Sequence, residues 1–324
     1  MAYRILITRK IPDAGIRLLQ EKGYELEINL RDHPLDRETL KEKIRHCHGI
    51  IALLSDSIDK EIIDVAPQLK IIANYAVGYN NIDVAYATKR GIWVSNTPDV
   101  LTAATADLAW ALLMAVSKRI VEADAYVRAG KFKGWAPELF LGHDVSGKTL
   151  GIIGAGRIGQ AVGRRARGFE MTILYHSGSR KPEFERQNGA QYVSLDELLA
   201  RSDFVSLHCP LTKKTRHLLN APRLKSMKTG SILINTARGA VVDEAALVRA
   251  LKQGPLAGAG LDVYEHEPQI HQELLTLKNV VLLPHIGSAT VETRNEMARM
   301  AARNVISVLE SGKAINPVNQ IDSV

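Results

Sequence analysis

Short apolar runs and segments with helical periodicity alternate along the first hundred residues. The apolar runs predict strands at residues 4–8, 24–30, 49–54, 69–75 and 92–95. The segments between them predict helices at residues 12–22, 37–47, 59–66 and 82–89. Strands that alternate with helices are typical of a parallel sheet with helical crossovers, and a run such as residues 50–54 fits a strand covered on both faces.

A second alternating array follows a break at Thr97-Pro98-Asp99. The pattern predicts one long helix from about residue 102 to residue 130, and then a loop over residues 134–147. Strands are predicted at residues 149–153, 171–176, 204–208, 231–235, 260–263 and 280–283, before a final helix at residues 292–310. The fold class is therefore α/β, with two doubly wound parallel sheets.

The composition is that of a globular protein, since 46% of the 324 residues are hydrophobic and 24% are charged. No apolar run approaches the ~18 residues of a membrane helix, and the first residues lack the pattern of a secretion signal. Two cysteines, Cys47 and Cys209, exclude a disulfide framework. We therefore expect a cytoplasmic protein with no membrane partner.

The formal net charge of +7 does not by itself indicate a nucleic-acid partner. The basic residues are scattered at helical spacing, which is typical of solvated helix faces, and aromatic residues make up only 5% of the chain. The tripeptide His46-Cys47-His48 suggests a metal ligand set, but no second cluster of such residues follows at a metal-binding spacing. We expect neither nucleic acid nor a metal.

The strongest local motif is Gly-x-Gly-x-x-Gly at Gly154, Gly156 and Gly159, directly after an apolar run and at the start of a helix. A dinucleotide pyrophosphate needs bare backbone N–H groups at the positive end of a helix. Gly154 would allow the tight turn, Gly156 the close approach of the phosphates, and Gly159 the packing of helix on strand. The alternative is a glycine-rich turn that serves packing alone.

The next predicted strand ends in Ser177-Gly178-Ser179-Arg180. NAD usually meets an acidic residue at this distance from the glycines, whereas hydroxyls and a guanidinium can bind the 2′-phosphate of NADP. The segment therefore favours NADP, with NAD also possible. An ordinary polar surface loop is the alternative.

Three later segments carry ionisable residues in an otherwise apolar or glycine-rich setting. Arg238 comes just past one predicted strand, Asp262 and Glu267 belong to the segment of the next, and His285 comes past a third. An arginine fork suits a carboxylate, and a histidine is a natural proton donor near neutral pH. A nearby glutamate would hold the imidazole and favour its protonated form. The set suits reduction of a 2-keto acid, although each residue alone would fit a structural histidine or a surface ion pair. Cys209 has no evident base and is expected to line the nucleotide.

These segments together resemble the D-isomer-specific 2-hydroxyacid dehydrogenases, and most closely their glyoxylate/hydroxypyruvate reductase branch. The resemblance covers nearly the whole chain. It is carried by the glycine triplet and by the segments that begin at Asn74-Tyr75-Ala76-Val77-Gly78, Asn96-Thr97-Pro98-Asp99, Thr236-Ala237-Arg238-Gly239, Gly260-Leu261-Asp262-Val263 and Pro284-His285-Ile286-Gly287-Ser288.

The resemblance implies a flavodoxin-like substrate domain, residues 1–100 and 288–324, into which a Rossmann-like coenzyme domain, residues 101–287, is inserted. It implies a homodimer built through the long helix and the loop that follows. His285 would be the acid/base, Glu267 its partner and Arg238 the substrate anchor. Other substrate contacts would come from Leu53, Ser55, the backbone of Val77 and Gly78, and Trp135. Cofactor contacts would fall on Gly154, Ala155, Gly156, Arg157, Ile158, Gly159, Ser177, Gly178, Ser179, Arg180, Cys209, Thr236, Ala237, Arg238, Asp262, His285, Ile286 and Gly287.

Several functions remain open on this scaffold. Reduction of 2-ketogluconate, formation of D-lactate and oxidation of phosphite would use the same three catalytic residues. A nucleotide-sensing adaptor without enzymatic activity is a further alternative, although the long extra segments of such proteins are absent from this sequence. NADP-using relatives commonly carry an arginine at the position of Gly178, so Arg180 would have to take over its role.

Overall fold

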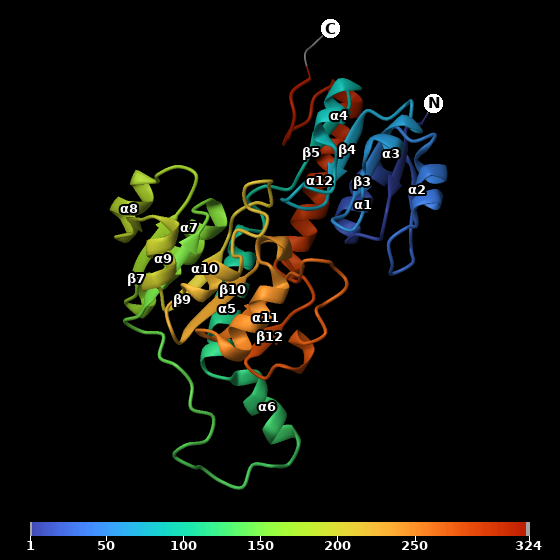
Figure 1. Ribbon diagram of the computed structural model, residues 1–324. Coiled ribbons are helices and arrows are strands. Elements are labelled where there is room, and N and C mark those ends of the chain that lie inside the picture. The colour runs from blue at the N-terminus through green and yellow to red at the C-terminus, as the bar shows by residue number, and fades with distance from the viewer. Residues whose placement is uncertain (1, 322–324) are drawn as a thin grey trace. The chain divides into compact units, whose positions relative to one another are not determined.

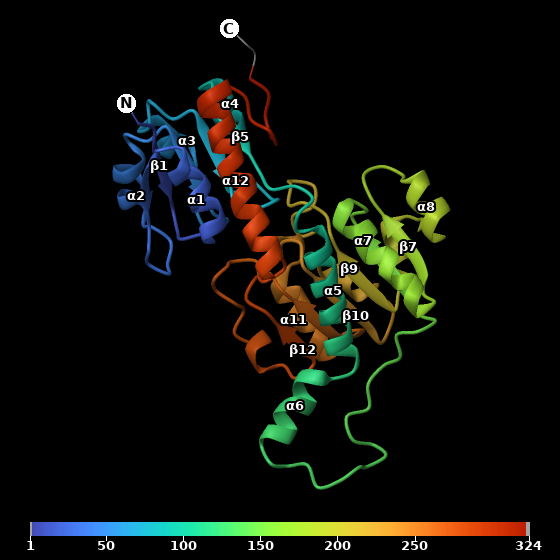
Figure 2. The same cartoon turned by 180° about the vertical axis from the view of Figure 1, so that it is seen from behind.

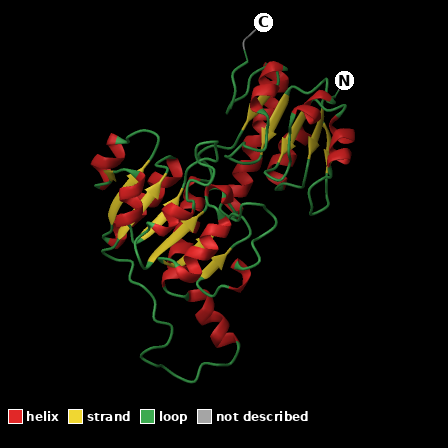
Figure 3. Ribbon diagram, viewed as in Figure 1, coloured by secondary structure: helices red, strands yellow, loops and turns green. Residues whose placement is uncertain are grey.

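In the computed structural model, which describes residues 2–321, the chain forms two units, each built on its own parallel sheet (Figure 3). The first unit contains the chain up to Leu101 together with the segment from Ser288 onward. The second unit is Thr102–Gly287. None of the described helices is long and apolar enough to cross a bilayer.

The sheet of the first unit has five strands in the order β2-β1-β3-β4-β5, all parallel. This is the order of a flavodoxin-like sheet, the kind of domain that the family resemblance implies. Helices α2, α3 and α4 cover one face, where Leu40, Ile62 and Ala87 pack on the strands. The strands are β1 (Arg4–Ile7), β2 (Glu25–Ile28), β3 (Gly49–Ala52), β4 (Ile71–Asn74) and β5 (Trp93–Ser95), and these helices are α2 (Arg37–Ile44), α3 (Lys60–Asp64) and α4 (Val84–Lys89).

Helices from both ends of the chain pack together in the first unit. Helix α1 (Asp13–Glu21) lies beside α12 (Val291–Ser311), as the rear view shows (Figure 2). The contact depends on Gly15, because a Cβ atom there would come within 2.4 Å of the carbonyl oxygen of Ala298. After α12 the chain returns to the sheet, where the N–H of Val318 donates to the carbonyl of Val94 at 2.8 Å.

The second unit has seven parallel strands in the order β12-β11-β10-β9-β6-β7-β8. This order, which reverses direction between β6 and β9, is that of a Rossmann-like sheet. The strands are β6 (Thr149–Ile153), β7 (Thr172–His176), β8 (Gln191–Tyr192), β9 (Phe204–Leu207), β10 (Ser231–Asn235), β11 (Leu256–Leu261) and β12 (Val280–Leu282).

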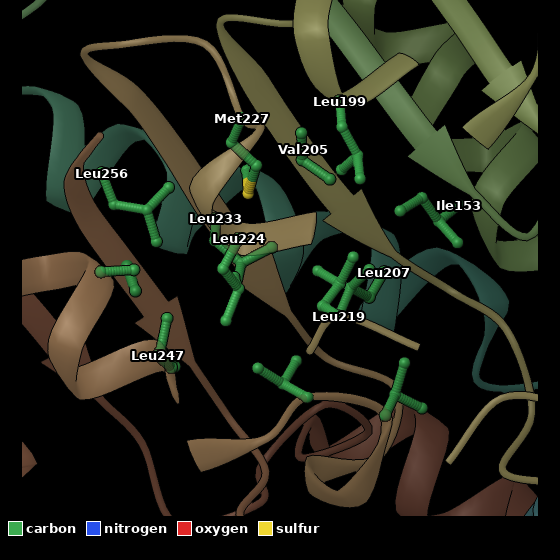
Figure 4. Close-up of a cluster of buried hydrophobic side chains, with 14 of the residues drawn as sticks. Ile153, Leu199, Val205, Leu207, Leu219, Leu224, Met227, Leu233, Leu247 and Leu256 are labelled. Atoms are coloured by element: carbon green, nitrogen blue, oxygen red, sulfur yellow. The ribbon is translucent and has the colours of Figure 1, made fainter. Parts of the chain in front are cut away.

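Helices cover both faces of the larger sheet (Figure 1). On one face, α5 (Thr102–Ser117) and α7 (Arg157–Ala166) bury Trp110 and Val162 against the strands. On the other face, α9 (Leu195–Arg201), α10 (Ala221–Lys225) and α11 (Glu244–Gln253) bury Leu199, Leu224 and Leu247 (Figure 4). The remaining helices are α6 (Ile120–Arg128) and α8 (Pro182–Asn188).

Side-chain caps mark the beginning of many of these helices. The capping side chain accepts a hydrogen bond from a backbone N–H in the first turn, which satisfies a donor that the helix leaves unpaired. Caps of this kind are made by Asp36, Asp59, Asp83, Ser194, Asn220, Asp243 and Thr290.

The prediction of one helix from residue 102 to residue 130 was wrong, because the segment breaks into α5 and α6. Arg119 adopts a left-handed conformation at the break, with φ of 54°. The loop that returns toward β6 accounts for it, since the N–H of His143 donates to the carbonyl of Ser117 at 2.8 Å. Gly142 lies so close to that carbonyl that a Cβ atom would be 2.2 Å from the oxygen.

Two strands also differ from the prediction. The short edge strand β8 was not predicted, because two residues carry no periodicity. Strand β11 begins at Leu256, four residues earlier than predicted, because its alanines and glycines are buried without forming an apolar run of large residues.

Candidate active site

The glycine loop forms a tight turn at the carboxyl end of β6. Gly154 has φ of +97°, and its N–H donates to the carbonyl of His176 at 2.8 Å. A Cβ atom on Gly154 would lie 2.5 Å from the nitrogen of Cys209, and one on Gly159 would lie 2.1 Å from the carbonyl oxygen of Gly154. Both glycines are therefore required by the packing of this turn.

Gly156 differs from its two neighbours in the motif, because a Cβ atom there would point into open space. It is the N-cap of α7, and no side chain caps this helix. The helix N-terminus without a side-chain cap and the absence of side-chain bulk at Gly156 fit the pyrophosphate of a dinucleotide.

Two buried polar atoms directly after β10 and β11 give a second test of the fit to a cofactor. Among residues 2–321, Thr236 Oγ1 and Asp262 Oδ2 are buried without a hydrogen-bond partner. Buried polar atoms are nearly always paired, so each of these two is able to hydrogen-bond to a group of a bound ligand. An amide-bearing ring and a ribose provide such groups, and these residues therefore fit a nicotinamide dinucleotide.

The predicted 2′-phosphate segment follows β7, whose register sets His176 beside Ile153 at the glycine loop. The charged side chains of this segment form hydrogen bonds within the chain. Arg180 donates to Glu185 from Nε to Oε1 at 2.9 Å, from Nε to Oε2 at 3.0 Å and from Nη2 to Oε2 at 2.9 Å. Lys181 Nζ donates to the hydroxyl of Ser179 at 2.9 Å. A 2′-phosphate would therefore share Arg180 with a carboxylate that the sequence analysis did not take into account.

Arg238 lies directly after β10, in a loop that Asn235 shapes. The Asn235 side chain donates to the carbonyl of Arg238 at 3.0 Å and accepts from the N–H of Ala237 at 3.0 Å. Burial lowers the pKa of the guanidinium, and the charge of Glu267 opposes that shift. A cation that has lost much of its water favours binding a planar anion such as a carboxylate.

The loop of Arg238 packs on the turn that carries Glu267. A Cβ atom on Gly239 would lie 1.8 Å from the carbonyl carbon of Tyr264, so the two backbones touch at this point. The N–H of Tyr264 in turn donates to Glu267 Oε1 at 3.0 Å. Arg238 and Glu267 are thus brought together by backbone contacts rather than by flexible side chains.

Glu267 and His285 form a direct pair, with 2.8 Å between Oε2 and Nδ1. Burial raises the pKa of Glu267, but the hydrogen bond and the charge of His285, together with the N–H of Tyr264, outweigh it and hold that pKa below its ordinary value. The carboxylate therefore stays ionised at neutral pH. His285 itself has φ of +56°, a strained conformation for a non-glycine residue, which is often found at functional sites.

Asp262 fixes the turn that follows β12. Its side chain is only 1% exposed, and Oδ1 accepts from the N–H of Ile286 at 2.7 Å. Burial raises the pKa of this carboxyl group, against the effect of the Ile286 hydrogen bond and the charge of His285. Asp262 thus holds the backbone next to His285, while its other oxygen remains available to a ligand.

The residues expected to meet the substrate carboxylate lie on the first unit, after β3 and β4. Leu53 and Ser55 follow β3, and Val77 and Gly78 follow β4. In a sheet of this order, ligands bind at the carboxyl ends of the strands near the point where the order reverses, between β1 and β3. Within residues 2–321, the N–H groups of Val77 and Gly78 donate to no protein acceptor.

Two other predicted site residues have contrasting environments. Cys209 is buried, and burial raises the pKa of its thiol to about 11, so it is not a nucleophile at neutral pH. Trp135 lies in the long loop after α6 and is 85% exposed, which is unusual for so large an apolar side chain.

Sequence reasoning missed two groups of polar residues around these sites. One is the pair of His217 and Glu265, which lie 2.5 Å apart in the same region as the Glu267 turn. The other is a set of asparagines: Asn74 ends β4, Asn81 lies in the loop after it, and Asn96 follows β5. The asparagines stand within the motifs that carry the family resemblance, so their position in those motifs was the available signal.

Known proteins resemble this chain over nearly its whole length. Residues 110–287 match the model of the NAD binding domain of D-isomer specific 2-hydroxyacid dehydrogenases. A glyoxylate reductase from Thermococcus onnurineus is 56% identical over 311 residues, which cover 95% of this chain and 93% of the relative.

Two solved structures have the same fold. A protein from Thermus thermophilus is 48% identical, with a TM-score of 0.92 and coverage of 98% of this chain and 100% of its own. The NADPH-dependent glyoxylate/hydroxypyruvate reductase from Sinorhizobium meliloti, in complex with NADP and malonate, is 34% identical, with a TM-score of 0.87 and full coverage of both chains.

Proposed function

This chain belongs to the D-isomer specific 2-hydroxyacid dehydrogenase family, and on that premise we propose that it reduces glyoxylate, and also hydroxypyruvate, to the 2-hydroxy acid. It is an NAD(P)-dependent dehydrogenase. The observation that carries the proposal is the pair of Glu267 and His285 next to Arg238, because a proton donor beside an anion-binding guanidinium suits a 2-keto acid. The relatives named glyoxylate reductase support the choice of substrate.

Each residue of the trio has a separate role in this proposal. Arg238 binds the carboxylate of the keto acid and orients it. His285 polarises the carbonyl and delivers a proton to its oxygen, and Glu267 stabilises the imidazolium through the 2.8 Å contact. The nicotinamide cofactor, when bound, supplies the hydride. Gly154–Gly159, Thr236 and Asp262 would hold it, and the first unit would provide the substrate domain.

Initial rates test the substrate. We expect glyoxylate and hydroxypyruvate to be reduced with higher kcat/KM than 2-ketogluconate or pyruvate when each is assayed with NADPH and with NADH. The trio serves all of these substrates, so only the rates separate them. A clear preference for 2-ketogluconate or pyruvate would overturn the proposal of a glyoxylate reductase.

We propose NADPH as the preferred cofactor, because Ser177, Gly178 and Ser179 place no carboxylate directly after β7. A Ser177→Asp substitution should shift the ratio of kcat/KM for NADPH over NADH toward NADH by about 10- to 100-fold. The new carboxylate would repel the 2′-phosphate and accept from the ribose hydroxyls of NAD. Rates with both cofactors measure the ratio.

The matched control for this prediction is Ser226→Asp, which adds the same charge at an exposed serine after α10. It should leave the ratio unchanged. A native enzyme that prefers NADH would contradict the assignment of the 2′-phosphate site.

We also propose a homodimer built through α5, α6 and the following loop. No residue of α6 is buried in the single chain. Large apolar side chains are exposed along this segment, which extends from the rest of its unit (Figure 1): Ile120, Val121, Val127, Phe132, Trp135 and Leu141. Exposed apolar patches of this kind mark interaction surfaces.

We also propose that the enzyme is cytoplasmic, because the thiols of Cys47 and Cys209 are free and buried.

Sedimentation velocity tests the dimer. The native protein should sediment with twice the monomer mass, whereas a Val121→Asp/Val127→Asp variant should sediment as a monomer. Burying two unpaired carboxylates in each half of the interface should cost more free energy than the association of the subunits releases. Val291→Asp, at an exposed apolar residue outside this segment, should remain a dimer. A native monomer would refute this assembly.

A further inference from the structure

Three asparagine side chains bind the backbone of the loops that follow β3 and β4 in the first unit. Asn81 donates through its amide nitrogen to the carbonyls of Leu53, at 3.0 Å, and Asp56, at 3.1 Å. The Asn81 side chain thus connects the loop after β4 to two points of the loop after β3. Among the described residues, the amide oxygen of Asn81 is buried without a donor, so the bridge depends on the amide nitrogen alone.

The other two asparagines donate to backbone carbonyls of the loop after β4. Asn74 donates to the carbonyl of Gly78 at 2.6 Å, and Asn96 donates to the carbonyl of Val77 at 2.8 Å. Asn74 also accepts from the Asn81 amide at 3.4 Å, which links these two side chains directly, whereas Asn96 binds only the backbone of the same loop. The carbonyl of Ala76 is held as well, since it accepts from the N–H of Thr97 at 2.9 Å. Each carbonyl lies in one peptide plane with the N–H of the next residue, so the bonds to the carbonyls of Ala76 and Val77 fix the N–H groups of Val77 and Gly78.

The loop after β3 is fixed from its other side by Asp56, which is 5% exposed. Its carboxylate accepts from the N–H of Leu53 at 2.7 Å and from the hydroxyl of Thr8. Asn81 and Asp56 therefore hold Leu53 by its carbonyl and by its N–H respectively. Both loops contain residues that we assign to the substrate.

We propose that Asn81 is a positioning residue for recognition of the substrate carboxylate. It does not touch the keto acid. It sets the distance between the loop of Leu53 and the loop of Val77 and Gly78, so that the two N–H groups meet the carboxylate in a fixed geometry. The inference rests on the proposed function, since it takes the ligand to be a small 2-keto acid.

The test replaces Asn81 by aspartate, which keeps the shape of the side chain and removes the donor. An oxygen would then face the carbonyl oxygens of Leu53 and Asp56 as well as the amide oxygen of Asn74. We expect the KM for glyoxylate to rise about 10- to 100-fold, since several hydrogen bonds to one buried amide are lost. The kcat should stay within about threefold of the native value, because the proposed proton donor lies on the other unit.

Oxalate, a dicarboxylate analogue of glyoxylate, provides a second readout. Its competitive inhibition constant should rise by the same factor as the KM, whereas the dissociation constant of NADPH, measured by fluorescence titration, should not change. Asn81→Ser, which adds no charge, should raise the KM and the oxalate inhibition constant by a smaller factor, and it should likewise leave kcat and the dissociation constant of NADPH nearly unchanged. Its fold should persist, because the N–H of Ile58 still donates to the carbonyl of residue 81 at 2.9 Å.

Asn319→Asp is the matched control. Asn319 is 8% exposed and binds the carbonyl of Ile92 and the N–H of Val94, away from both loops. This variant should lose thermal stability and keep the native KM and oxalate inhibition. If Asn81→Asp and Asn81→Ser both behave like the control, the positioning role is wrong. If the native enzyme neither reduces a 2-keto acid nor binds oxalate, the proposed function itself fails.

Discussion

A His285→Ala enzyme is expected to lose about 10²- to 10⁴-fold in kcat/KM for glyoxylate, the usual span for loss of a general acid. Reduction requires a proton on the carbonyl oxygen at the time the hydride arrives, and His285 is the group paired for that role. The dissociation constant of NADPH should change little, because most proposed cofactor contacts remain. Initial rates and fluorescence titration measure the two quantities separately.

The pH profile tests the partner of this histidine. Glu267 is ionised at neutral pH, because its pKa lies below the ordinary value. Glu267→Gln keeps the shape and removes the charge that stabilises the imidazolium, so a given pH leaves less of the acid form. The pH midpoint above which kcat/KM for reduction falls should therefore be lower in the variant than in the native enzyme. For each pH unit by which the midpoint is lowered, kcat/KM measured above the midpoint should be about tenfold smaller. At low pH the variant should approach the native rate.

A second histidine–glutamate pair provides the controls for both substitutions. His217 and Glu265 lie 2.5 Å apart, and Glu265 shares its turn with Glu267. His217→Ala and Glu265→Gln should leave the midpoint of the pH profile in place, even where they lower stability. Superimposable profiles for the native and Glu267→Gln enzymes would reject the coupling, and a His285→Ala enzyme of native activity would reject the acid.

Arg238→Lys should lower kcat/KM for glyoxylate about a hundredfold, although the substitution keeps the charge. A guanidinium forms two parallel hydrogen bonds to a carboxylate, whereas an ammonium forms one strong contact, and a charged hydrogen bond contributes ~1.5–3 kcal/mol. Lysine would also lose the bond from Arg238 Nη1 to the carbonyl of Ala237, at 2.7 Å. Steady-state kinetics with glyoxylate, at saturating NADPH, provide the measurement.

Arg223→Lys is the control for this arginine. Arg223 Nη1 likewise donates to a backbone carbonyl, that of Leu218 at 2.8 Å, but it has no place in the proposed site. Its kinetics should be native. Near-native kinetics in the Arg238→Lys enzyme would exclude a bidentate substrate anchor.

The sequence predicted the two sheets and the glycine loop because each depends on a local pattern. Buried parallel strands are continuous apolar runs. In the glycine loop, a Cβ atom would clash with backbone at Gly154 and Gly159 but would meet open space at Gly156, in agreement with the separate roles that the motif gives them. The pairing of Glu267 with His285 was inferred from the family resemblance and from chemistry. Their separation of 18 residues carries no geometric information by itself.

The features that the sequence did not predict depend on contacts between distant residues. The break between α5 and α6 is made by His143 and Gly142, which return from a loop to the end of α5. The bond of Arg180 to Glu185 joins two residues that read separately as surface charges. The bridge from Asn81 to Leu53 spans 28 residues, and nothing in either segment alone indicates it.

The packing of α12 on α1 has a consequence for the order in which the protein folds during synthesis. The first 101 residues leave the ribosome before the other unit, yet the helix that covers α1 and β4 begins at Val291. Until then the surface around Gly15 lacks its partner, and an apolar face of the first unit is exposed. The second unit is continuous in sequence and can complete its core meanwhile. Nascent chains should therefore acquire a protease-resistant second unit first, and the unit that begins the chain should be the last to become stable.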